Sequence, residues 1–319
     1  MTGLMLNARA AAIADRMVAD AERLRIAVHR IEGGATVIDA GVDAAGGYEA
    51  GVCLSEICMG GLGRISLGPV AVGDGVYPGV TVVTDHPAEA CMASQYAGWA
   101  ISVEKFFGMG SGPLRAHARV EKELFERLGY EEAAERGVLV LEGRALPTAT
   151  VAEYVGRKAR LDPSRLTFLV APTASLAGGV QISARILETG LHKMETLGFD
   201  VHRVVSGFGT APVATLSKND LRGIGRTNDC ILYGGQAHYT IRATDDELAQ
   251  LAATLPATAS KDYGVPFYDI FQRYDRDFYK IDPLLFSPAE VWLTSAESGR
   301  TFHGGKLAPD ILAASLYPG

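Results

Sequence analysis

A strand, a helix and a second strand in residues 165–209 decide the fold class that the sequence predicts. "RLTFLVAP" (165–172) is a short apolar run typical of a buried strand, and "VQISARILETGLHKMETLG" (180–198) has the periodicity of an amphipathic helix. "HRVVSGFG" (202–209) follows as another strand. Such alternation favours an α/β protein with mixed sheets.

The same alternation extends outward along the chain in both directions. Two strands are predicted around a Gly-Gly turn in 25–42, and Pro87 is placed to open a helix over 88–101 after the strand 78–85. Further predicted elements are strands in 137–143, a helix in 151–161, a pair of strands in 228–243 and a helix in 245–255.

Length and composition indicate a globular protein with a large core. The chain has 319 residues, of which 48% are hydrophobic and 21% charged. Because a single core seldom grows to this size, we expect two α/β lobes, 1–165 and 166–319, which need not be continuous in sequence.

The charge balance argues against a nucleic-acid partner. The formal net charge is −7, and clustered Lys or Arg, which nucleic-acid binding normally requires, are absent. A small anionic ligand stays possible because only the local potential of a pocket matters for it.

The N-terminus and the cysteines predict a cytoplasmic protein. Residues 1–24 have the pattern of an amphipathic helix, without the basic and apolar regions of a signal peptide, so we expect neither a leader nor a membrane span. The four cysteines show no CxxC spacing and are expected to be reduced and mostly buried.

Familiar catalytic motifs are missing from the sequence. There is no GxxxxGK[ST], no GxGxxG after a strand, and "GMGSGP" (108–113) does not satisfy G-x-S-x-G around Ser111. The seven histidines are scattered without HExxH, so a metal site is not predicted. Asp85-His86 is better explained as a helix cap beside a packed histidine.

The helix predicted over 180–198 carries one polar stripe. Its members, at helical spacing, are Gln181, Arg185, Glu188 and His192. Spacing alone favours a solvated ion pair between Arg185 and Glu188. The preceding loop, with Thr173, Ser175 and glycines, favours a pocket wall instead. A glutamate in such a pocket is suited to activate water as a general base.

Six long blocks, in order along nearly the whole chain, give this sequence a specific resemblance. It resembles the methenyltetrahydromethanopterin cyclohydrolase family of one-carbon metabolism, found in methanogenic archaea and in bacteria that oxidise formaldehyde. The blocks are "YEAGVCLSEICMGGL" (48–62), "TDHPAEACMASQYAGWAI" (84–101), "GMGSGP" (108–113), "PTASLAGGVQISARILETGLHKM" (172–194), "GRTNDCILYGG" (225–235) and "DPLLFSPAEV" (282–291).

The resemblance implies a fold, an assembly and a reaction. The expected fold is two α/β domains with mixed sheets and a deep pocket between them, assembled as a homotrimer. The expected reaction is the reversible hydrolysis of 5,10-methenyltetrahydromethanopterin to the N5-formyl derivative, with neither a metal nor an organic cofactor. The pterin is the only partner it implies.

The family's Q-x-x-x-R-x-x-E motif assigns the catalytic roles. It falls here on Gln181, Arg185 and Glu188 without departure. Glu188 is expected to take the proton from water as it attacks the electrophilic bridging carbon, and Arg185 to orient Glu188 and set its protonation.

Further residues are expected to contact the pterin. They are Ser94, Gln95, Ser111, Gln181 and Arg226, and for Arg226 a structural ion pair with Asp229 is an equal alternative. Two other functions stay open on the sequence: a pterin-binding protein without turnover, and a metal-dependent enzyme resembling an amidohydrolase.

Overall fold

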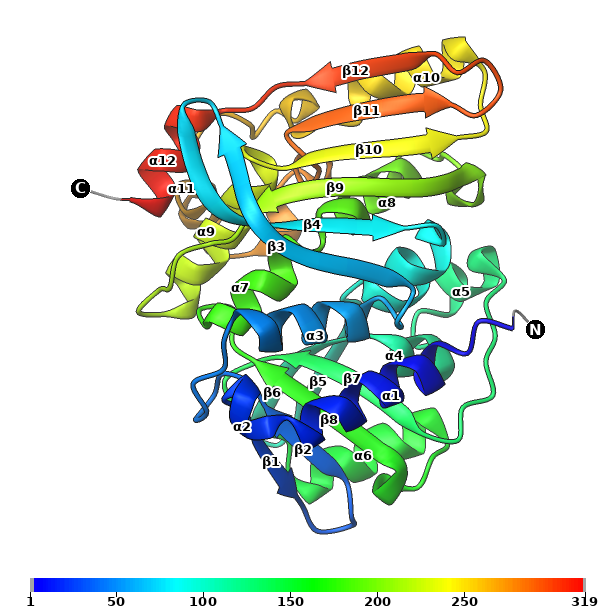
Figure 1. Ribbon diagram of the computed structural model, residues 1–319, viewed down its shortest axis with the longest axis vertical. Helices are drawn as coiled ribbons and strands as arrows, with labels where there is room; N and C mark the ends of the chain where they lie inside the picture. Colours follow the sequence, from blue (N-terminus) through cyan, green and yellow to red (C-terminus); the bar gives the residue numbers. More distant parts are fainter. Residues whose placement is uncertain (1–2, 318–319) are drawn as a thin grey trace. The chain divides into compact units, whose positions relative to one another are not determined.

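The computed structural model describes residues 3–317, which form two compact units with one six-stranded sheet in each (Figure 1). Unit 1 contains the described residues up to Arg64 together with Glu89–Gln181. Unit 2 contains Ile65–Ala88 and the described residues from Ile182 onward. The chain therefore passes from one unit to the other three times.

The sheet of unit 1 has the strand order β1-β2-β8-β7-β6-β5. Strands β2, β8 and β7 are parallel to one another, while β1, β6 and β5 pair with their neighbours in antiparallel fashion. The strands are β1 (Ala27–Arg30), β2 (Thr36–Asp39), β5 (Trp99–Val103), β6 (Phe106–Ser111), β7 (Gly137–Glu142) and β8 (Leu166–Ala171).

Helices cover both faces of this sheet. On one face α1 (Leu6–Ala19) and α3 (Tyr48–Cys58) pack against Leu169 and Ala171 of β8. On the other, α6 (Ala149–Ala159) packs against Phe168 and Val170. Every residue of β8 is consequently buried, which explains its uninterrupted apolar sequence. Unit 1 also contains the helices α2 (Ala21–Leu24), α4 (Pro113–Ala118) and α5 (Lys122–Leu128), the short 3-10 helix η2 (Pro163–Arg165), and most of the π-helix η1 (Ala88–Gln95) and of α7 (Leu176–Ser183).

The sheet of unit 2 has the order β12-β11-β10-β9-β4-β3. Strands β10 and β11 are parallel, whereas the pairs β12–β11, β10–β9 and β9–β4 are antiparallel. The strands are β3 (Gly63–Val72), β4 (Gly75–Thr84), β9 (Val204–Pro212), β10 (Gln236–Ile241), β11 (Glu290–Ser295) and β12 (Thr301–Gly305).

The helices α8 (Ile186–Thr196), α9 (Asp220–Leu232) and α10 (Asp245–Thr254) lie behind this sheet in Figure 1 and pack on one of its faces. The opposite face carries a cross-strand row of rings, Phe208, His238, Trp292 and His303, and Phe208 is 44% exposed. Burial alternates along β10 and β11, as expected for a sheet covered on one face. The helices α11 (Phe267–Arg273) and α12 (Pro309–Leu316) share a core with α9.

The predicted α/β class with mixed sheets is confirmed, but the units differ from a division at residue 165/166. Residues 166–171 form β8, which pairs with β2 and β7 and so belongs to unit 1. Residues 75–84 form β4, which pairs with β9 and so belongs to unit 2. Strand pairing, which a sequence does not display, sets the division. The deep pocket implied by the resemblance stays a prediction.

The predicted pair of strands in 228–243 is half wrong. Only its second half is a strand, β10, whereas Asp229–Leu232 ends helix α9. The N-cap of that helix is Asn219, whose side chain accepts a hydrogen bond from the Arg222 N–H at 3.0 Å. A short apolar run such as "CIL" fits a buried helix face as well as a strand, so the local pattern does not distinguish the two.

The helix predicted over 88–101 is shorter than expected. It ends at Gln95 as a π-helix, and Trp99–Val103 form strand β5, in which Trp99 and Ile101 are buried while Ala100 and Ser102 are exposed. This two-residue alternation is the period of a strand. Strand β3 was not predicted either, because its glycines were interpreted as a loop.

Asp39 closes β2 and holds the loop that follows it. The carboxylate is fully buried and accepts four backbone N–H bonds, of 2.7 to 2.9 Å, from Gly41, Val42, Asp43 and Ala44. Burial alone raises the pKa of this carboxyl, but the four amide donors together bring it below its usual value of 3.8. The charged form therefore stabilises the folded protein.

We expect Asp39→Asn to lower the free energy of unfolding at pH 7 by about 2 kcal/mol, since an amide satisfies fewer of these donors. Because the folded-state pKa lies below the unfolded value of 3.8, the contribution is complete well above 3.8 and is lost as the pH falls from there through the folded-state pKa. Urea titrations at several pH values measure both effects. Asp43→Asn, an exposed carboxylate in the same loop, is the control, and equal losses in the two variants contradict this account.

Candidate active site

The predicted pair Arg185 and Glu188 lies at the start of α8. Arg185 is the N-cap residue, and Glu188 lies in the first turn, where the helix dipole favours a negative charge. Arg185 Nη1 is 3.7 Å from Glu188 Oε2, and the two side chains are only 10% and 7% exposed. The solvated ion pair that spacing alone favoured is therefore not what the structure contains.

The helix predicted over 180–198 is two helices. Helix α7 (Leu176–Ser183) ends before Arg185, and α8 begins at Ile186. Gln181 thus belongs to a different helix from Glu188, and the continuous polar stripe is wrong. Neither glycine nor proline marks the break in the sequence. The break between the two helices coincides with a tertiary contact, in which Ser183 Oγ donates to the Pro212 carbonyl at 2.8 Å.

Helix α8 is anchored by two buried side chains that the sequence analysis did not identify. Tyr239 Oη, from β10, donates to the Leu187 carbonyl at 2.9 Å. Lys193 Nζ, from the helix itself, donates to the Pro256 carbonyl at 2.8 Å. Lys193 is 1% exposed, and burial lowers its pKa to about 8. The sequence around Lys193, with Met194 beside it in a helix, does not indicate that the lysine is buried.

Three of the predicted substrate-binding residues of unit 1 meet at Cys58. Gln181 Nε2 donates to Cys58 Sγ at 3.3 Å, and Ser111 Oγ lies 3.4 Å from the same sulfur. Ser94 Oγ donates to the Cys58 carbonyl at 2.6 Å, and the Ser94 carbonyl accepts from the Gly112 N–H at 2.8 Å. These residues come from α3, η1, β6 and α7 and are all buried. Gln95, beside Ser94, is buried as well.

Cys58 itself was expected only to be a reduced and buried thiol. It is free and fully buried, as are Cys91 and Cys230, while Cys53 is half-buried. Its position as the centre of a polar cluster had no sequence signal, because cysteine is normally a small apolar residue of the core. The pterin contacts of Ser94, Gln95, Ser111 and Gln181 stay predictions.

The loop that leads into α7 is shaped by hydrogen bonds. Thr173 Oγ1 donates to the Glu142 carboxylate at the end of β7, and Ser175 Oγ donates to the Pro172 carbonyl at 2.7 Å. Gly178 precedes the helix predicted over 180–198, but it lies inside α7 in the structure. A Cβ added at Gly178 would be 2.0 Å from the Pro172 oxygen. This glycine permits a close approach of two backbones.

Comparison with known proteins places the chain in a family. A family model described as "Cyclohydrolase (MCH)" matches residues 5–316. A methenyltetrahydromethanopterin cyclohydrolase of Methylobacillus flagellatus is 48% identical over 300 residues, covering 94% of this chain and 91% of the relative. Proteins of the same name from Methylobacterium organophilum and Methanosarcina barkeri are 46% and 44% identical, each over 98% of this chain and 97% and 98% of their own.

The chain belongs to the methenyltetrahydromethanopterin cyclohydrolase family. The resemblance seen in the six sequence blocks is thereby confirmed. Relatives from a methanogen and from methylotrophic bacteria are similar to this chain by nearly the same degree. The match spans both units, so it includes the elements that carry Arg185 and Glu188 as well as the Cys58 cluster.

Arg226, from a family-like block in α9, makes three contacts with one loop. Its Nη1 donates to Thr215 Oγ1 at 3.0 Å and to the Leu216 carbonyl at 2.7 Å, and lies 3.4 Å from Ser217 Oγ. The ion pair with Asp229, the alternative considered for Arg226, is not formed. Asp229 instead accepts from the Phe267 N–H at 2.8 Å and from Ser315 Oγ. Burial raises the pKa of Asp229 to about 7.

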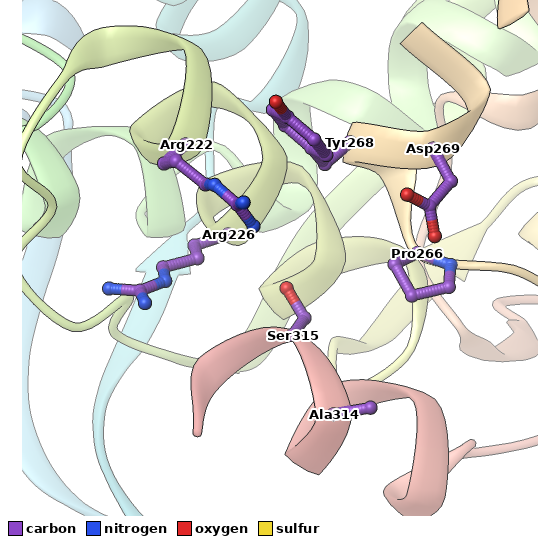
Figure 2. Close-up of a pocket in the computed structure, with 7 residues that line it drawn as sticks. All are labelled: Arg222, Arg226, Pro266, Tyr268, Asp269, Ala314 and Ser315. Atoms are coloured by element: carbon purple, nitrogen blue, oxygen red, sulfur yellow. The ribbon is translucent and has the colours of Figure 1, made fainter. Parts of the chain in front are cut away.

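Arg226 also lines a small pocket of about 100 Å³ beside α9, α11 and α12 (Figure 2). Arg222 lies with its guanidinium 4.3 Å from the centre of the Tyr268 ring, and Ser315 points into the space between the helices. The pocket combines both signs of charge, since Asp269 lines it opposite the two arginines. The contact of Arg226 with the pterin stays a prediction, because the hydrogen bonds described above do not test it.

Among residues 3–317, no three His, Cys, Asp or Glu side chains gather as a metal ion would require. None of the helices in this range is both long enough and apolar enough to cross a membrane.

Proposed function

We propose that this chain catalyses the reversible hydrolysis of 5,10-methenyltetrahydromethanopterin to N5-formyltetrahydromethanopterin. The observation that carries the proposal is the family match over residues 5–316, together with the buried Arg185–Glu188 pair at the position of the family's motif. A buried pair of opposite charges is seldom retained for stability alone, because desolvating both groups offsets most of their attraction. A catalytic use of the pair explains its position.

Glu188 acts as the general base and then as the general acid. The bridging carbon of the substrate belongs to an amidinium-like cation and is already electrophilic. As the oxygen of water bonds to this carbon, Glu188 takes one proton of the water, and a neutral carbinol forms. The bond from the carbon to N10 then breaks, N10 receives the proton from Glu188, and the carbinol O–H releases its proton to give the formyl group on N5.

Arg185 orients the carboxylate and sets its protonation. The guanidinium lies near Glu188 Oε2 at 3.7 Å, which leaves room for the contact to shorten when substrate binds. Glu188 has to accept a proton and then return it, and the neighbouring cation supports this exchange through a charge-assisted hydrogen bond.

The remaining parts of the proposal are the predicted pterin contacts and the assembly. Ser94, Gln95, Ser111, Gln181 and Arg226 are the residues that we propose to contact the pterin. We propose that neither a metal nor an organic cofactor takes part, because the substrate supplies its own positive charge. A homotrimer in the cytoplasm, as the sequence leads us to expect, is the proposed assembly and location.

A spectrophotometric assay tests the activity directly. We expect purified protein to remove the methenyl absorbance of 5,10-methenyltetrahydromethanopterin, and to act far more slowly on the folate analogue. Turnover should be unchanged in the presence of a chelator. Binding without turnover contradicts the proposed activity, and loss of turnover in chelator contradicts the absence of a metal.

Glu188→Gln should lower kcat by about 100-fold or more while pterin binding persists, because the amide cannot accept the proton of water. Steady-state kinetics and a binding titration measure the two effects. The matched control is Glu247→Gln, which alters a carboxylate paired with Arg203 at 2.9 Å on the surface of the same unit. Near-normal kcat in Glu188→Gln removes Glu188 from the role of base.

Arg185→Ala should lower kcat by about tenfold or more and change the pH–rate profile, since the carboxylate loses its neighbouring cation. Arg203→Ala, which breaks the surface pair, serves as the control and should leave the profile in place. A profile of Arg185→Ala identical to that of the wild type rules out the proposed control of protonation.

A further inference from the structure

We infer that Tyr239 is a positioning residue for Glu188, acting through the backbone of α8. The inference rests on the proposed role of Glu188. The Tyr239 hydroxyl donates to the carbonyl of Leu187 at 2.9 Å, and this carbonyl belongs to the peptide group whose nitrogen is that of Glu188. Rotation or displacement of that peptide group would move the Glu188 side chain with it.

The position of Tyr239 makes it a rigid support. It lies within β10, paired with Gly207 of β9 on one side and with Leu293 of β11 on the other. Its side chain is 1% exposed, so neither the ring nor the hydroxyl has solvent to move into. A hydrogen bond from the middle of a sheet fixes the helix more tightly than one from a loop.

Glycine residues allow α8 to come within reach of the hydroxyl. A Cβ added at Gly190 would lie 2.1 Å from Tyr239 Oη and 3.0 Å from Cζ. On β9, a Cβ at Gly207 would lie 3.0 Å from Leu187 Cδ1, and one at Gly209 would lie 2.9 Å from Ile186 Cγ2. The first turns of the helix therefore rest directly on the backbone of the sheet.

This hydrogen bond complements the ion pair. At 3.7 Å, the contact of Arg185 with Glu188 is longer than a hydrogen bond, so before it shortens on substrate binding the backbone of α8 has to hold Glu188 in place. The anchors at Ser183 and Lys193 hold the chain five residues before and five residues after Glu188. Tyr239 is the anchor beside the catalytic residue itself.

Tyr239→Phe removes only the hydroxyl and tests the inference. We expect kcat to fall by about fivefold to tenfold, KM for the methenyl substrate to stay within about twofold, and the pH–rate profile to shift. Tyr233→Phe is the matched control, because it removes another buried hydroxyl of unit 2 that donates to a backbone carbonyl, that of Val265. A wild-type kcat and profile in Tyr239→Phe, or the same change in Tyr233→Phe, overturns the inference.

Gly190→Ala supplies a second test through its steric conflict with Oη. Alone, it should reduce kcat more than Tyr239→Phe does, because the new methyl group pushes the helix away from the sheet. Combined with Tyr239→Phe, which removes the nearest clashing atom, it should recover part of that loss. A double variant no better than Gly190→Ala alone contradicts the geometry.

The outcomes separate this inference from the proposed function. Loss of turnover in Glu188→Gln with normal turnover in Tyr239→Phe overturns the positioning role and leaves the proposed function in place. Normal turnover in Glu188→Gln overturns the role of Glu188 as base, and the positioning role with it.

Discussion

Two opposite charges buried at the beginning of α8 are the constraint around which unit 2 is organised. Removing such groups from water is costly unless they are held with their partners, so the helix that carries them cannot drift from its sheet. Unit 2 meets this requirement with three side chains that donate hydrogen bonds to backbone carbonyls, namely Ser183, Tyr239 and Lys193. Glycines on β9 bring the helix close enough for these short contacts.

Unit 1 also holds buried polar side chains in place, but without a buried charge. Its polar residues Gln181, Ser111 and Ser94 lie on separate elements and form hydrogen bonds with Cys58. Gln181 and Ser111 contact the sulfur, a weak and polarisable hydrogen-bonding atom that orients them without fixing them strongly, whereas Ser94 donates to the Cys58 carbonyl. Within unit 1, the carboxyl-terminal edge of the parallel strands carries Asp39 and Glu142, each at the end of its strand and each accepting hydrogen bonds from neighbouring donors. The ends of parallel strands are the usual place for polar residues in α/β folds.

Much of the fold and the catalytic pair were predictable, and the failures have physical reasons. Strand β8 was identified because burial on both faces gives a continuous apolar run, and α10 was identified because burial of one face gives a helical period. The break before Arg185, the helical end of α9 and the burial of Lys193 depend on tertiary contacts that leave no local pattern. Arg185 and Glu188 were found by resemblance, since their spacing alone favoured a surface ion pair that the burial of both groups excludes.

The threefold passage of the chain between the units has a consequence for synthesis on the ribosome. Unit 1 cannot close its sheet until β8 has emerged, because β8 lies between β2 and β7. The β3–β4 hairpin is made early but has to wait for β9, more than a hundred residues later in the chain, before it gains its partner. A nascent chain therefore carries an unpaired hairpin edge while more than a hundred residues are added, and edges of this kind are prone to aggregate. Neither half of the gene, cut at its middle, encodes all the strands of either sheet.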